Sequence, residues 1–151
     1  MRSSDGTELI EVSAHASVKP EAVMEVLTDG WLFGLWVVGA SHIRSVDADW
    51  PQPGSKIHHA VGAWPALVKD HSEAKVYESD GVLEMTARGW PLGEALVRIE
   101  VHEKDGSSHI ALGERIVSGP GRFVRPVERL LVAPRNKESL SRLVALAEGR
   151  A

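Results

Sequence analysis

Apolar and polar residues alternate in short runs through the middle of the chain, from about residue 43 to residue 117. The runs are separated by the turn-forming stretches WPQPGS, AWPA, ESDG, GWPLG and KDGSS. Alternation with a period of two, interrupted by proline and glycine at such intervals, is typical of antiparallel strands joined by hairpins. We therefore predict six strands here, over residues 43–49, 55–63, 66–77, 82–89, 94–103 and 108–117.

The two ends of the chain have a different periodicity. Residues 7–16 form a loosely alternating run that predicts a first strand, and Pro20 then stands where a helix can begin, because the first helical position needs no N–H. Residues 30–37, GWLFGLWV, predict a second short helical or irregular piece. The last part predicts a long helix, which Pro134 should kink or interrupt. Its apolar positions at helical spacing are Val127, Leu130, Leu131, Leu140, Leu143, Val144 and Ala147.

The order strand, two helices, six strands and helix predicts one α+β domain over residues 1–151, since no repeat, linker or low-complexity tract divides the chain. The simplest packing places the long C-terminal helix on one face of an antiparallel sheet. If the sheet curls strongly around that helix, the space between them need not be filled by side chains.

The composition narrows the classes of function. The chain has 151 residues with a formal net charge of -4, and neither sign forms a block, so nucleic acid is not expected as a partner. The absence of cysteine excludes disulfides, thiolate nucleophiles and cysteine-bound metals. No apolar run approaches the roughly 20 residues that span a bilayer, and residues 1–12 lack the apolar run of a signal peptide. We therefore expect a cytoplasmic protein.

Two adjacent histidines, His58 and His59, stand in the second of the six predicted strands. Successive side chains of a strand point to opposite faces, so the two rings cannot bind one metal ion together. The alternation groups His59 with Ile57 on the predicted inner face. We expect no metal and no cofactor.

A hairpin through AWPA pairs residues whose numbers add to about 129, which places Asp70 opposite His59 on the inner face. The two side chains could form a general acid/base pair, or a satisfied internal hydrogen bond with no catalytic role. Glu114 is a third titratable group that alternates with apolar neighbours on the inner face of its strand. Such groups must be paired or hydrated in a cavity, because burial without partners costs several kcal/mol.

The order of elements, together with the stretches WVVGASHIRSVDADWPQPGSKIHHAVGAWP, LEMTARGWPLGEALVRIEV and PRNKESLSRLVALAE, resembles the SRPBCC superfamily, and in particular its polyketide cyclase/dehydrase and lipid-transport-like proteins. The resemblance extends from about Leu9 to Glu148. It implies a START-like helix-grip fold, in which seven antiparallel strands wrap a long C-terminal helix and leave a deep, largely apolar cavity. It specifies no reaction, since this fold serves several functions.

Our first hypothesis for the function is the binding or carriage of a small apolar or aromatic molecule, polyketide-like or lipid-like, in that cavity. The candidate ligand-binding residues lie on the predicted inner face, on the last helix and near the entrance: His59, Asp70, Glu114, Asn136 or Arg135, and Trp36 or Trp90.

Two alternatives remain open. One is a cyclase, dehydratase or hydrolase in which His59, oriented by Asp70, acts as the general base. The only tyrosine, Tyr77, alternates outward, and we match no cyclase active-site motif residue by residue. The other is an interaction module or homodimer, which an exposed apolar patch around Trp31 to Trp36 would favour.

Overall fold

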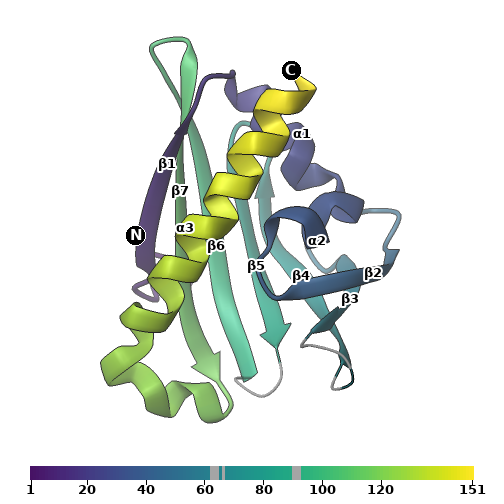
Figure 1. Cartoon of the computed structure of the whole chain (residues 1–151), viewed down its shortest axis with the longest axis vertical. Helices are drawn as coiled ribbons and strands as arrows, with labels where there is room; N and C mark the ends of the chain where they lie inside the picture. Colours follow the sequence, from purple (N-terminus) through teal and green to yellow (C-terminus); the bar gives the residue numbers. More distant parts are fainter. Residues whose placement is uncertain (62–64, 66, 90–92) are drawn as a thin grey trace.

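The computed structural model describes residues 1–61, 65, 67–89 and 93–151, and it contains the elements that the sequence predicts (Figure 1). The strands are β1 (Ile10–Ala16), β2 (Ala40–Val46), β3 (Lys56–Val61), β4 (Val68–Glu78), β5 (Val82–Gly89), β6 (Gly93–Lys104) and β7 (Ser107–Ser118). The helices are α1 (Pro20–Thr28), η1 (Gly30–Leu32), α2 (Phe33–Trp36), η2 (Pro120–Val124) and α3 (Arg125–Arg150).

The seven strands form one antiparallel sheet in the order β1-β7-β6-β5-β4-β3-β2. In Figure 1 the sheet curves around α3, which crosses its concave face diagonally, while α1 lies beside the C-terminal end of α3 and α2 lies beside β2. The predicted α+β class and the helix-grip arrangement are therefore confirmed.

The first and last residues of the strands differ from the prediction by a few positions. Strand β2 begins at Ala40 and ends at Val46, whereas residues 43–49 were predicted. Asp47 ends it, because its main chain and side chain both bond to Lys56: the Asp47 N–H donates to the Lys56 carbonyl, and the Lys56 N–H donates to Asp47 Oδ2 at 3.0 Å. The local side chain thus closes the β2–β3 connection before the alternating pattern ends.

Helix α3 continues through Pro134, so of the two expected effects of this proline, a kink or an interruption, the interruption does not occur. Figure 1 shows the helix changing direction in its green first turns, on the N-terminal side of the long yellow part. Proline removes one i to i−4 hydrogen bond, but the packing of the rest of the helix is sufficient to maintain it. Among the described helices, none has both the length and the apolarity to cross a bilayer.

The core lies where the C-terminal half of α3 packs with β1, β7 and α1. Leu140, Leu143 and Ala147 are fully buried there. The apolar residues at the start of the helix behave differently, because Val127, Leu130 and Leu131 are exposed. The inward-facing positions of α3 in its first three turns are polar or small-apolar instead, namely Glu128, Val132 and Asn136.

Candidate functional site

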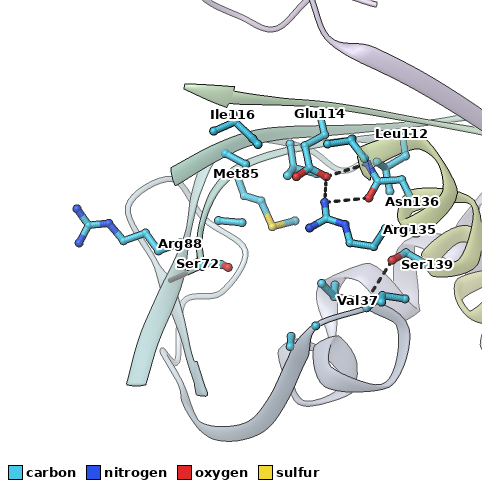
Figure 2. Close-up of a pocket in the computed structure, with 18 of the residues that line it drawn as sticks. Val37, Ser72, Met85, Arg88, Leu112, Glu114, Ile116, Arg135, Asn136 and Ser139 are labelled. Carbon is cyan, nitrogen blue, oxygen red and sulfur yellow. Dashed lines mark hydrogen bonds and ion pairs between the residues drawn. The ribbon is translucent and has the colours of Figure 1, made fainter. Parts of the chain in front are cut away.

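A cavity of about 240 Å³ lies between the concave face of the sheet, α2 and the first half of α3 (Figure 2). Its apolar lining comes from all three: Phe33, Trp36, Val37, Met85, Ala87, Ala95, Val97, Leu112, Ile116, Leu131 and Val132. The strand residues among them follow the alternation of the sequence, since Leu112, Glu114 and Ile116 all point inward from β7. The inner face predicted for this strand is therefore confirmed.

A three-residue polar cluster stands at the helix side of this cavity. Glu114 on β7 accepts hydrogen bonds from Arg135 Nη2 and from Asn136 Nδ2, the latter at 2.7 Å. Arg135 Nη2 also donates to Asn136 Oδ1 at 3.1 Å. Figure 2 shows the three side chains meeting beside Met85. Glu114 and Asn136 are buried, and Arg135 is partly exposed, so the ion pair gives the buried carboxylate the compensation that it requires.

Arg135 keeps unused hydrogen-bonding capacity. A guanidinium group has five N–H donors, and the bonds within the cluster involve only its Nη2 atom. Its Nε is buried and has no partner among the described residues. The arginine can therefore still donate to an oxygen atom of a molecule that enters the cavity.

His59 lines the opposite, sheet side of the cavity and is only 2 % exposed. Its Nε2 lies 3.0 Å from Ser72 Oγ on β4, and Phe33 stacks on the ring with the two centroids 5.7 Å apart. Burial disfavours the imidazolium, which lowers the pKa of His59 to about 4, although the Asp70 charge acts in the opposite direction. The ring is thus neutral at neutral pH.

Asp70 lies opposite His59 across strands β3 and β4, as the predicted hairpin between residues 59 and 70 requires. The side-chain contact is different from the predicted one, because His59 bonds to Ser72 and its Nδ1 has no partner among the described residues. The Asp70 carboxylate accepts from the His71 N–H at 2.9 Å instead, and it is not part of the cavity wall. A hydrogen bond that orients the imidazole therefore comes from Ser72 and not from Asp70.

The adjacent histidines point to opposite faces, as expected. His58 Nε2 lies 3.2 Å from Asp47 Oδ1, away from the cavity. Among the described residues, no group of three or more His, Asp or Glu side chains is arranged to hold a metal ion.

Of the two tryptophans predicted near the entrance, Trp36 lines the cavity but is 3 % exposed, so it lies in the wall and not at the mouth. Its ring meets Phe33 edge to face, with the centroids 5.5 Å apart. Trp90 lies outside the described residues. Arg88 is exposed at the rim, where Figure 2 shows it pointing away from the cavity, and it pairs with Glu94.

The sequence reasoning missed Ser72, Phe33 and Ser139 as cavity residues. Ser139 Oγ accepts from the Val38 N–H at 3.1 Å and so ties α3 to the residues that follow α2. Ser72 could have been found, because the period-two alternation of its strand groups it with Asp70 and Ala74 on the face that was predicted to point inward. Ser139 gave no such signal, since a serine on a charged helix segment reads as solvent-exposed.

The low pKa of His59 predicts a specific loss of stability in acid. Between pH 6.5 and about 4 the unfolded chain binds a proton at this ring and the folded chain does not, so the free energy of unfolding falls as the pH is lowered through this interval. We expect His59→Gln to remove about 3 kcal/mol of that fall, as measured by urea denaturation at a series of pH values. His15→Gln, at an exposed histidine, is the control and should keep the original slope. An unchanged slope in His59→Gln would contradict the burial of a neutral ring.

Comparison with known proteins places the fold. No protein-family model matches the chain, and no curated protein matches it by sequence. Among solved structures, it is similar to the Zhui aromatase/cyclase from a Streptomyces species, with a TM-score of 0.72, 13% identity and 93% of each chain covered.

Two further solved structures are similar to this chain over nearly its whole length. Protein CV1439 from Chromobacterium violaceum has a TM-score of 0.70 at 16% identity, over 94% of this chain and 99% of that one. Ara h 8.0201 has a TM-score of 0.65 at 13% identity, over 95% and 96%. At these low identities the likeness shows the fold alone: the chain has the helix-grip arrangement, a curved antiparallel sheet around a long C-terminal helix, that the sequence predicts.

Proposed function

We propose that residues 1–151 act as one SRPBCC-like domain that binds or carries a small apolar or aromatic molecule, polyketide-like or lipid-like, in the cavity under α3. The observation that carries the proposal is an apolar cavity with a few converging polar groups, which is the usual composition of a small-molecule site. The similar aromatase/cyclase is consistent with a ligand of this kind.

The size of the cavity sets the scale of the ligand. An engineered apolar cavity of about 150 Å³ in another protein holds benzene, so a cavity of about 240 Å³ accommodates a larger ring system or a short chain. Each ring or methylene that enters gains roughly 25 cal/mol for every Å² of apolar surface removed from water. Affinity therefore comes mainly from the apolar body of the ligand.

The polar cluster sets the chemistry of one end of that ligand. Arg135 has free donors, but Glu114 already offsets its charge. A carboxylate would be attracted by the guanidinium and repelled by the adjacent Glu114, whereas a carbonyl or phenol oxygen accepts the hydrogen bond without this repulsion. We therefore expect an uncharged oxygen acceptor, such as a ketone, at this end.

Filling the cavity should abolish binding of a matching probe. Prodan, a naphthyl ketone with polarity-sensitive fluorescence, has the required apolar body and carbonyl. Val97→Phe places a bulkier, aromatic side chain in the cavity wall on β6, and we expect it to raise the Kd for prodan about tenfold or more, because the added volume overlaps with the ligand. His102→Phe, at an exposed position on the outer face of the same strand, is the matched control. Equal affinities of the wild type, Val97→Phe and the control would place the probe elsewhere.

The polar cluster should distinguish a ketone from its apolar parent. In the double variant Glu114→Gln/Arg135→Met the donor is lost without leaving a buried carboxylate unpaired. We expect the Kd for prodan to rise roughly tenfold, since a hydrogen bond to a charged group contributes about 1.5–3 kcal/mol. Binding of dimethylaminonaphthalene, which lacks the ketone, should stay the same.

Arg142→Met, an exposed arginine on the same helix, is the control for this double variant and should bind both probes as the wild type does. If the double variant bound both probes more weakly to the same extent, the cavity itself would be damaged, and the result would not report the loss of a specific donor.

An enzyme of cyclase, dehydratase or hydrolase type is the second candidate, favoured by the His59–Ser72 pair in the cavity wall. A pKa of about 4 leaves His59 neutral but makes it a weaker base than one whose pKa is near the working pH, which is why binding is the better supported function. Asp70 remains a proposed contributor through its charge. Conversion of a co-purified ligand, followed by mass spectrometry, that is lost in His59→Ala while binding persists would favour catalysis; equal conversion in this variant would exclude a role for His59.

A further inference from the structure

The protein exposes a compact apolar surface on η2 and the first turns of α3. Its side chains have unusually large exposed fractions for apolar residues: Phe123 is 75 % exposed, Leu130 74 %, Leu131 54 % and Val127 45 %. Exposed apolar residues that occur singly are normal, but four within nine residues form a patch that indicates an interaction site. We call these four residues, together with the arginines described next, the η2–α3 surface.

Three arginines are interleaved with the apolar residues. Arg122, Arg125 and Arg129 are all exposed, and the Arg122 guanidinium lies 5.1 Å from the centre of the Phe123 ring. The only acidic residue between positions 119 and 134 is Glu128, which is fully buried. Glu128 accepts from Arg115 Nη1 and from the Ile116 N–H, so its charge is held inside the fold.

The charge of this surface is opposite to that of the remaining chain. The formal net charge is -4, and subtracting the three arginines leaves -4 − 3 = -7 for everything else. An anionic surface would therefore attract the η2–α3 surface and repel the rest of the molecule. This charge asymmetry therefore orients the protein with the η2–α3 surface toward an anionic surface and also contributes to the affinity.

The η2–α3 surface also borders the cavity. Leu131 belongs to both, and the next residues of the helix, Val132 and Arg135, line the cavity wall. In Figure 1 the green start of α3 forms a projecting corner of the molecule, at the end where β7 finishes. A flat partner that contacts this corner would lie next to the cavity.

We propose that the η2–α3 surface docks on an anionic lipid bilayer. Exposed aromatic and aliphatic side chains on one helical segment, interleaved with arginines, have the composition of interfacial membrane-binding helices. The apolar side chains would enter the headgroup region while the arginines contact lipid phosphates. The proposal does not depend on which molecule occupies the cavity, but it brings the cavity next to the bilayer, from which an apolar ligand could be taken up.

A second copy of the chain fits this surface less well. In a twofold dimer each surface packs on its own equivalent, so both sets of three arginines would meet without an exposed carboxylate from either segment. Phosphate headgroups, in contrast, pair with all three arginines at once.

Vesicle co-sedimentation tests the proposal directly. We expect the full chain to sediment with phosphatidylcholine vesicles that contain phosphatidylglycerol, and to bind vesicles of phosphatidylcholine alone much more weakly. The variant Arg122→Gln/Arg125→Gln/Arg129→Gln should lose about fivefold in partitioning per arginine, or on the order of a hundredfold in all. Added salt should weaken the binding of the wild type and have little effect on this variant.

Lys19→Gln/Lys104→Gln/Arg150→Gln is the matched control, because it removes the same charge from exposed positions outside the η2–α3 surface. It should bind anionic vesicles almost as the wild type does. Phe123→Ser/Leu130→Ser changes exposed residues, so the fold should survive, as checked by circular dichroism, while binding falls at least tenfold. Equal losses in the two charge variants, or unchanged binding of Phe123→Ser/Leu130→Ser, would overturn the proposal.

The competing occupants give different results. Sedimentation velocity should show a monomer, and a dimer that Phe123→Ser/Leu130→Ser dissociates would assign the surface to a second copy and overturn the proposal. Polyglutamate serves as the probe for an acidic protein. Binding to polyglutamate as strong as binding to anionic vesicles, and independent of Phe123 and Leu130, would also overturn it.

Discussion

The rotation of α3 about its own axis is the constraint on which the other features depend. Leu140, Leu143 and Ala147 are fully buried against the core and fix which side of the helix faces the sheet. Because an α-helix returns to the same side about every four residues, the inward line then continues through Asn136 and Glu128. The C-terminal half of the helix therefore decides what the N-terminal half presents on each side.

The consequence is a helix whose first turns are polar inside and apolar outside. Glu128 is held by Arg115 and the backbone of β7, and Asn136 by Glu114, so each inward polar group has a partner. Fully satisfied polar groups stabilise a defined arrangement, whereas an unpaired one would cost several kcal/mol. The same rotation turns Leu130 and Leu131 outward, and thus the cavity cluster and the exposed apolar surface have one origin.

The cavity combines two environments that act on different parts of a ligand. On the sheet side, burial under Phe33 keeps His59 neutral and bonded to Ser72. On the helix side, Arg135 is paired with Glu114 and keeps N–H donors that have no partner among the described residues. An apolar molecule with one oxygen acceptor suits both. The exposed arginines lie on η2 and on the outer side of the same helix, so the surface through which the protein would meet a bilayer lies next to the cavity.

The sequence alone determined the α+β class, the seven strands, the pairing of His59 with Asp70 and the inward position of Glu114, because period-two alternation and hairpin turns are local properties. Only the tertiary structure decided which groups within reach of each other form bonds: His59 bonds to Ser72 and not to Asp70, and Arg135 joins Glu114. The sequence also pointed to Leu130 and Leu131 as part of an apolar stripe, although both are exposed. Helical spacing reports which residues share a face, but the direction of that face depends on contacts with the distant strands, and no local pattern encodes those contacts.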